Sequence, residues 1–337
     1  MRAAPVFWRE PPGFLASLLS PVGAVYDTAG RLRRATSRSY HPPVPVVCVG
    51  NLVAGGAGKT PVALALATWL MERGVPVHVV TRGYGGRLRG PVRVDPTCHD
   101  AVAVGDEALL LSTRAPCWVA RDRAAGVRAA VAGDAGAILL DDGLQNPTVA
   151  KTLGLIVVDG GYGFGNGRVI PGGPLRENLR RGLARADAVV LLAAEGDASD
   201  AEGLLPGCGV PVLNAVLAPL NGERLAGMRL LAFAGIGRPE KFFTTLQALS
   251  ADLVSTRAFP DHHPFRGAEL EALRRDAELS GARLVTTVKD IVRVPPAQQA
   301  GIEVLDVEVR WSDPNALARL ISPLIDGSRS ESVQSRG

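Results

Sequence analysis

Cysteine is scarce in this chain, and the cysteines that occur are not spaced as ligands or redox pairs. There are four in 337 residues, and none forms the CxxC spacing of zinc and redox motifs. This distribution excludes a zinc ribbon, a dithiol redox centre and a disulfide scaffold. We expect all four to be buried or incidental thiols: Cys48, Cys98, Cys117 and Cys208.

Long apolar runs are also missing. No stretch approaches the roughly 18 consecutive apolar residues that cross a bilayer, and the N-terminus lacks the apolar core and cleavage site of a signal peptide. We therefore expect the protein to stay in the cytoplasm. Hydrophobic residues make up 47% and charged residues 21% of the chain, which is typical of packed globular domains and excludes a collagen-like or disordered protein.

The excess of positive charge is confined to the N-terminus. Residues 1–40 contain six arginines and two acids, so this segment alone carries the formal net charge of +4. A nucleic-acid-binding protein would spread such charge along a groove, so we expect no nucleic-acid partner.

Apolar residues of this basic segment fall at helical intervals, and Pro21 predicts a kink or the start of a second helix. Such a helix either lies on an anionic membrane surface or packs on its own domain. The apolar positions are Phe14, Leu15, Leu18, Leu19, Val22, Val25 and Tyr26.

Buried strands alternate with helices from residue 44 onward. We predict a helix at 60–73 and strands at 44–49, 75–80, 137–140, 155–158 and 188–192. This alternation predicts an α/β fold with a doubly wound, mostly parallel sheet, and the glycine-rich loop described below makes the fold P-loop NTPase-like. A glycine-rich passage at 219–227 precedes a strand at 230–234, which we interpret as the start of a smaller α/β domain.

These patterns divide the chain into four parts. Residues 1–40 form the basic amphipathic membrane-association segment, and residues 41–222 the P-loop domain. Residues 223–326 form the smaller C-terminal domain, and residues 327–337, rich in Ser, Arg and Gly, a disordered tail.

The strongest motif is a glycine-rich loop between the first strand and the first helix of the larger domain. Its backbone N–H groups can bind phosphate oxygens, Lys59 can bind the β- and γ-phosphates, and the Thr60 hydroxyl can ligate Mg²⁺. Val53 stands where a GxxxxGK[ST] motif has glycine, so the loop is a GGxGKT variant. The predicted ATP-binding residues are Asn51, Leu52, Val53, Ala54, Gly55, Gly56, Ala57, Gly58, Lys59 and Thr60.

Two carboxylates follow a second buried strand. Asp141 and Asp142 come directly after the apolar run at 137–140 and should emerge at the same edge of the sheet as the loop. One of the two is expected to hold Mg²⁺, directly or through water. The sequence leaves open which one.

Nine stretches, in order along nearly the whole chain, resemble the tetraacyldisaccharide 4'-kinase family. The resemblance is specific because the stretches occur together. They are VGNLVAGGAGKTP (49–61), TRGYGG (81–86), GDE (105–107), DDGLQ (141–145), FGNG (164–167), PGGPLRE (171–177), GIGRPE (235–240), FPDHH (259–263) and TTVKD (286–290).

The resemblance implies an ATP- and Mg²⁺-dependent kinase that phosphorylates the 4'-hydroxyl of tetraacyldisaccharide 1-phosphate, giving lipid IVA. It implies a peripheral protein at the cytoplasmic face of the inner membrane of a Gram-negative bacterium. Lys59 would serve catalysis, and Asp106 would be the base, assisted by His262 from the second domain. Motif register favours His262 over His263.

The resemblance also implies further positioning residues. They are Arg82, Tyr84, Arg123, Gln145, Arg176 and Glu177. Arg176 could clamp a phosphate or form an ordinary surface ion pair. Asn146 stands where the family usually has histidine, so any role of that imidazole is missing. We expect a monomer.

Two other P-loop classes and one non-enzymatic class remain as alternatives. A regulatory or partitioning ATPase also carries a GGxGKT loop, but residues 51–54 lack its signature lysine. A ligase of the dethiobiotin synthetase kind would leave the basic N-terminal helix unexplained. A membrane-surface binding module would not need the phosphate motif.

Overall fold

The computed structural model describes residues 5–193, 203, 205 and 209–334. A nine-stranded sheet has the order β13-β8-β7-β6-β1-β5-β2-β4-β3, and a second sheet has the order β10-β9-β11-β12. The strands of the larger sheet are β1 (Val46–Gly50), β2 (Val77–Thr81), β3 (Val92–Arg93), β4 (Cys117–Val119), β5 (Ala137–Asp141), β6 (Leu153–Asp159), β7 (Ala188–Ala193), β8 (Val212–Pro219) and β13 (Val307–Trp311). Those of the smaller sheet are β9 (Arg229–Ala234), β10 (Asp252–Ala258), β11 (Arg283–Thr287) and β12 (Ile302–Leu305).

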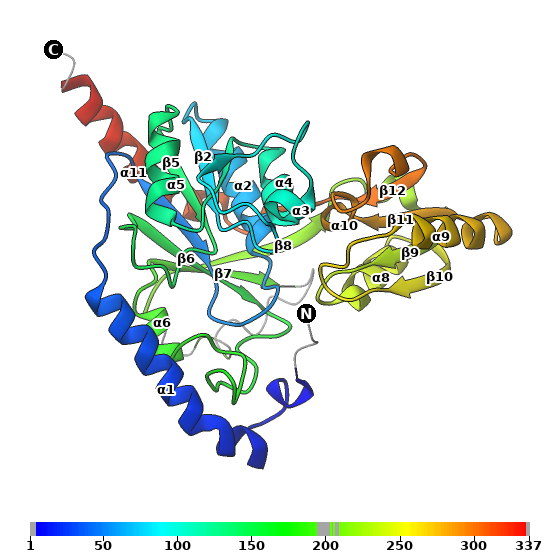
Figure 1. Ribbon diagram of the computed structural model, residues 1–337, viewed down its shortest axis with the longest axis horizontal. Helices are drawn as coiled ribbons and strands as arrows, with labels where there is room; N and C mark the ends of the chain where they lie inside the picture. Colours follow the sequence, from blue (N-terminus) through cyan, green and yellow to red (C-terminus); the bar gives the residue numbers. More distant parts are fainter. Residues whose placement is uncertain (1–4, 194–202, 204, 206–208, 335–337) are drawn as a thin grey trace.

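Helices cover both faces of the larger sheet, and the smaller sheet with its own helices lies to one side (Figure 1). The α-helices are α1 (Phe14–Thr36), α2 (Lys59–Met71), α3 (Ala101–Val104), α4 (Asp106–Ser112), α5 (Arg123–Ala132), α6 (Leu179–Leu183), α8 (Pro239–Ala248), α9 (Gly267–Leu279), α10 (Val288–Ile291) and α11 (Pro314–Gln334). Short 3-10 helices are η1 (Val6–Trp8), η3 (Gly222–Leu225) and η4 (Pro296–Gln298).

The larger sheet is doubly wound and parallel except at its two edges, as predicted. Among the strands that the structure describes, the β3–β4 and β13–β8 pairings of this sheet are antiparallel. Strands β1 and β5, of which β5 is apolar up to Asp141 at its end, are buried on both sides, because helices cover both faces. One face packs on Val62, Leu66 and Leu70 of α2, and the other on residues of α5.

The domain boundary differs from the predicted one. After β12 the chain returns to the larger sheet, where β13 pairs with β8. Leu317 and Ile321 of α11 are fully buried in the same hydrophobic cluster as α2. Residues 223–305 therefore form an inserted domain, and residues 307–326, predicted to belong to it, complete the larger one.

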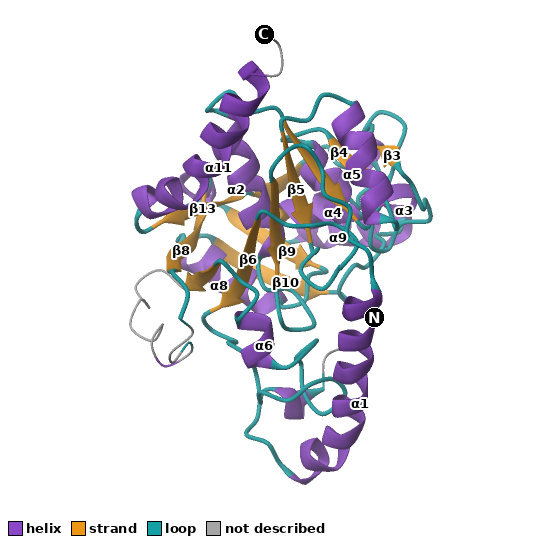
Figure 2. Ribbon diagram, turned by 90° about the vertical axis from the view of Figure 1, so that its left-hand side faces the viewer, coloured by secondary structure: helices purple, strands orange, loops and turns teal. Residues whose placement is uncertain are grey.

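The predicted ends of the chain also change. Helix α11 continues to Gln334, so residues 327–334, predicted as a disordered tail, are helical. Helix α1 is a single helix with Pro21 inside it, so no second helix begins there. It lies below the larger sheet in both views (Figures 1 and 2). In the described part of the chain, none of the helices has the length and apolar character needed to cross a bilayer.

Two of the predicted thiols are buried, Cys48 and Cys117, whereas Cys98 is exposed. Cys208 lies outside the described residues. The smaller sheet has its own core on each face, built around Phe233 and Leu270 on one side and Leu246 on the other.

The returning helix generates a stability prediction. Ile321→Ala removes a fully buried side chain from the larger core and should lower the free energy of unfolding by about 2–5 kcal/mol. Leu279→Ala on α9, whose side chain is 89% exposed, should change it by less than about 0.5 kcal/mol. Urea unfolding measures both values. Equal unfolding midpoints for the two variants would contradict the assignment of α11 to the larger core.

Candidate active site

The glycine-rich loop runs from the end of β1 into the first turn of α2. Gly58 has φ +82°, and a Cβ atom there would lie 2.3 Å from Cδ1 of Leu192, so only glycine fits. Asn51 is buried and donates from Nδ2 to the Gly55 carbonyl at 3.3 Å. Lys59 and Thr60 begin α2, whose free N–H groups and dipole favour an anion. Residues 51–60, predicted to bind ATP, thus form a loop whose geometry suits a phosphate, and we call them the phosphate loop.

A second segment pairs with this loop. We call residues 164–182 the bridging segment. Val53 forms an antiparallel bridge with Leu175, and the Ala54 N–H donates to the Pro174 carbonyl at 2.7 Å. The N–H of Arg176 donates to the Leu52 carbonyl at 2.8 Å. Sequence reasoning missed this pairing, because the bridging segment has no apolar periodicity.

Asp141 is buried at the end of β5, beside the loop. Its Oδ2 accepts a hydrogen bond from the Thr81 hydroxyl at 3.1 Å, and Oδ1 has no hydrogen-bond partner among the described residues. Burial and the nearby charges of Glu107 and Asp142 raise the pKa of Asp141 to about 7, against the opposing effect of Lys59. An unpaired, buried carboxylate oxygen at this edge suits a bound cation.

Asp142 has different partners. Nη1 of Arg176 lies 2.8 and 3.0 Å from its two carboxylate oxygens, and Nζ of Lys59 lies 3.8 Å from Oδ1. Burial alone would raise the pKa of Asp142, but Lys59 and Arg176 hold it below its usual value. Arg176, considered as a phosphate clamp or a surface ion pair, is paired here with an acid of the site.

Asp106 and His262 come together across the two domains. Nδ1 of His262 lies 2.8 Å from Oδ2 of Asp106, and the aromatic ring of Tyr84 lies 5.6 Å from the imidazole, centroid to centroid. Asp106 is buried at the first residue of α4, and its Oδ1 accepts from the Glu107 N–H at 2.9 Å. His263 instead pairs with Glu269 at 3.0 Å. The choice of His262 over His263 therefore agrees with the geometry.

Two cations of the smaller domain, absent from the predicted set, flank this pair. Nε of Arg293 lies 3.5 Å from Oδ2 of Asp106, and Nζ of Lys289 lies 3.2 Å from Oε1 of Glu107. Arg293 also binds Asp290, which is buried. For Lys289, the signal available in the sequence was the opposite charge of two stretches that resemble the family, GDE at 105–107 and TTVKD at 286–290.

These contacts set the charge state of Asp106. Burial alone would raise its pKa. The hydrogen bond with His262 and the positive charges of Lys289 and Arg293 outweigh burial, so the pKa of Asp106 lies below its usual value. Asp106 is therefore ionised at neutral pH, as a proton acceptor must be.

The remaining predicted residues lie around the same edge and differ in their burial and hydrogen-bond partners. Arg123 is buried and donates to the Ala120 carbonyl at 2.6 Å, and burial lowers its pKa. Gln145 donates to the Asn51 carbonyl at 2.9 Å and to Glu177 at 3.2 Å. Arg82 is exposed.

The departure at Asn146 has a structural explanation. Its side-chain oxygen accepts from the N–H and hydroxyl of Thr148 at 2.9 and 2.8 Å, which closes a turn after β5. The amide group is thus used in local structure.

The chemistry of the donors fits Mg²⁺ bound together with a nucleotide. The described residues contain no cluster of three or more His, Cys, Asp or Glu side chains arranged for a metal. Mg²⁺ is usually held by one or two protein oxygens plus substrate phosphates, so Thr60 and the unpaired oxygen of Asp141 suffice.

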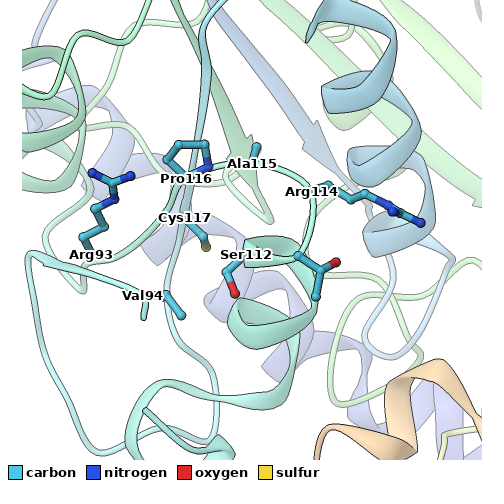
Figure 3. A pocket seen from close by; sticks show the side chains of 8 residues that line it. Arg93, Val94, Ser112, Arg114, Ala115, Pro116 and Cys117 are labelled. Carbon is cyan, nitrogen blue, oxygen red and sulfur yellow. The ribbon is translucent and has the colours of Figure 1, made fainter. Parts of the chain in front are cut away.

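Figure 3 shows a surface pocket of about 290 Å³. Arg93, Ser112 and Cys117 are among its lining residues, next to the start of β4. The phosphate loop lies at the other edge of the sheet, where the parallel strands end. The pocket is therefore not part of the candidate site.

Comparison with known proteins identifies the family. The family model described as tetraacyldisaccharide-1-P 4'-kinase (LpxK) matches residues 15–326. The chain belongs to the tetraacyldisaccharide-1-P 4'-kinase family. The members of this family are kinases, a class of transferase.

Relatives within this family match nearly the whole chain. A tetraacyldisaccharide 4'-kinase of Rhodospirillum centenum is 53% identical over 332 residues, covering 96% of this chain and 97% of the relative. One from Rhodospirillum rubrum is 51% identical over 328 residues, with 96% and 98% covered. The crystal structure of LpxK from Aquifex aeolicus in complex with ATP has 25% identity and a TM-score of 0.75, covering 93% of this chain and all of that one.

The Asp106–His262 contact generates a titration prediction. His262→Ala removes the hydrogen bond that lowers the pKa of Asp106, so this carboxyl should titrate at higher pH than in the unsubstituted protein. Carbon NMR of labelled aspartate, assigned with Asp106→Asn, measures the shift. His263→Ala should leave the titration in place. An unmoved Asp106 pKa in His262→Ala would show that the imidazole does not act on this carboxylate.

Proposed function

We propose that this chain transfers the γ-phosphate of ATP to the 4'-hydroxyl of tetraacyldisaccharide 1-phosphate, giving lipid IVA for lipid A biosynthesis. Membership in the kinase family and the similarity to an ATP-bound LpxK structure support the reaction class and the nucleotide. The observation that carries the proposal for the site is the contact between Asp106 and His262 at the edge where the phosphate loop lies. One chain supplies every proposed residue, so we propose a monomer.

The phosphate loop and Lys59 have the chemistry to bind ATP. Backbone N–H groups of a glycine-rich loop and a helix N-terminus bind phosphate oxygens, and a lysine at this position neutralises the β- and γ-phosphates. Mg²⁺, which Thr60 and Asp141 would hold, neutralises charge on the phosphates when bound. Arg176 and Lys59 keep Asp142 ionised beside them.

Asp106 is the proposed proton acceptor. Its carboxylate is ionised at neutral pH and can take the proton of the 4'-hydroxyl as that oxygen bonds to phosphorus. An aspartate is a weak base for an alcohol, but the loose transition state of phosphoryl transfer requires little proton removal before the new bond forms. His262 fixes the carboxylate by the 2.8 Å contact with Oδ2. Lys289 and Arg293 place further positive charge on this side.

A labelled-phosphate assay tests the reaction and the base. Purified protein with radiolabelled ATP, Mg²⁺ and tetraacyldisaccharide 1-phosphate should give labelled lipid IVA on lipid chromatography. Asp106→Asn should lower kcat by about 10²–10⁴-fold, the usual contribution of a general base, with the fold intact by circular dichroism. Asp252→Asn, an exposed acid on β10, is the matched control and should keep full turnover. Rapid ATP hydrolysis without labelled lipid would favour a partitioning ATPase instead.

We further propose that α1 binds the cytoplasmic face of the inner membrane. One side of the helix presents exposed apolar side chains, and the arginines follow at its C-terminal half. Such an arrangement is typical of helices that lie on an anionic bilayer, and the glycolipid substrate would be met there. The exposed apolar residues are Phe14, Leu15, Leu18, Val22, Val25, Tyr26 and Leu32.

Substitution of exposed α1 residues tests membrane binding without disturbing the inner side of the helix. Leu18→Ser with Val25→Ser should lower the affinity for anionic phospholipid vesicles by at least about tenfold, because each apolar side chain contributes about 1.5–3 kcal/mol when buried. Sedimentation with vesicles measures it. Leu279→Ser, an exposed position on α9, should bind as the unsubstituted protein does. Unchanged vesicle binding in the double variant would refute this orientation of α1.

A further inference from the structure

The inner side of α1 carries a buried acid. Asp27 is 7% exposed in a helix whose other buried residues are Ala16 and Gly23. Its Oδ1 accepts from the backbone N–H of Asn178 at 3.1 Å, and its Oδ2 pairs with the guanidinium of Arg181. A buried carboxylate is costly unless it is paired, and both of its partners here belong to the bridging segment.

Other contacts bind the N-terminal residues to the same segment. Trp8 donates from Nε1 to the Pro171 carbonyl at 3.1 Å and accepts at its own carbonyl from the Asn166 N–H at 2.8 Å. A Cβ on Gly23 would lie 2.8 Å from the Val169 carbonyl oxygen, so α1 lies directly on the segment. Arg34 lies 3.5 Å from the buried Glu177. One side of the bridging segment is thus occupied by η1 and α1.

The other side of the bridging segment is occupied by the phosphate loop. The hydrogen bonds of Pro174 and Arg176 with the loop backbone hold residues 52–54 in place. A Cβ on Gly182 would lie 2.5 Å from a methyl carbon of Leu52. Glu177 accepts from Gln145, which also binds the Asn51 carbonyl. Asp27 accepts its hydrogen bond from the N–H of Asn178, two residues after Arg176, whose own N–H binds the loop. Asp27 therefore fixes the position of the bridging segment relative to the phosphate loop.

We propose that Asp27 is a positioning residue that acts through the bridging segment on the phosphate loop and thereby on ATP binding. Nucleotide binding requires the loop backbone to be in its binding geometry. The apparent dissociation constant rises in inverse proportion to the fraction of the time that the loop spends in this geometry. The inference rests on the proposed function only in that the loop binds ATP. By thermodynamic linkage, any contact that holds α1 in place also favours nucleotide binding, and nucleotide binding in turn favours the docked position of α1.

Binding of a non-hydrolysable ATP analogue with Mg²⁺, measured calorimetrically without lipid on the full chain, tests the inference. Asp27→Asn keeps the shape and removes the charge, and its dissociation constant should rise about tenfold. Arg181→Gln removes the cation that pairs with Asp27. The Arg181 side chain is 43% exposed, so this substitution should weaken binding of the analogue without endangering folding. The double variant should be no weaker than the weaker single variant, because both act on one contact.

Matched controls separate this role from a structural one. Arg180→Gln removes the same charge from the neighbouring exposed position of α6, and Arg33→Gln removes an exposed charge from α1. Both should bind the analogue as the unsubstituted protein does. Asp27→Asn should keep its affinity for anionic vesicles, because the exposed apolar side of α1 is unchanged. If Asp27 had only a structural role, Asp27→Asn would lower the unfolding temperature, but the folded variant would bind the analogue with unchanged affinity.

The outcomes are distinct. If the unsubstituted protein binds no analogue, the proposed function fails. If it binds the analogue and the folded Asp27→Asn and Arg181→Gln variants bind equally well, the inference is overturned while the proposed function stands. Additive losses in the double variant would also overturn it, because the two residues would then act independently.

Discussion

The candidate site depends on one constraint of parallel sheets, which bring the carboxyl ends of all their strands to a single edge. β1 ends in the phosphate loop, its neighbour β5 ends in Asp141, and β2 beyond β5 ends at Thr81, which binds Asp141. Register between β1 and β5 places Val49 opposite Asp141. No local preference could bring together residues that are 92 positions apart, so the sheet itself positions them.

Charge at this edge is balanced between two groups of residues. Asp142, beside the phosphate loop, is compensated by Lys59 and Arg176 of the larger domain. Asp106 and its neighbour Glu107 are compensated mainly by the smaller domain, through His262, Lys289 and Arg293. The smaller domain therefore lowers the pKa of a carboxylate that it does not itself contain. Movement of the two domains apart would expose Asp106 to water and remove its partners.

Much of the fold and the main motifs could be predicted from the sequence, because they depend on local patterns. The strand–loop–helix at Val46–Met71 lies within two residues of its prediction, since buried strands and a glycine-rich turn have strong local signals. The pairing of β13 with β8 could not be predicted, because a short strand does not show which of two sheets it will join. The pairings of the bridging segment were also missed, because it has no apolar periodicity and its partners, such as Asp27, are about 150 positions away. The roles of the individual site residues remain predictions that await the experiments above.

The return of the chain to the larger sheet has a consequence for how the molecule forms. β8 ends at Pro219 and its antiparallel partner β13 begins at Val307, so this pairing closes a loop that contains an entire second domain. Closure of so long a loop costs less entropy once that domain has become compact, because its ends then lie near each other. During synthesis from the N-terminus, the last strand and last helix of the larger domain are made only after the inserted domain. Until then, β8 is an uncovered edge and the surface that α11 covers is open to water, so the nascent protein presents an edge strand and an apolar surface at which aggregation can begin.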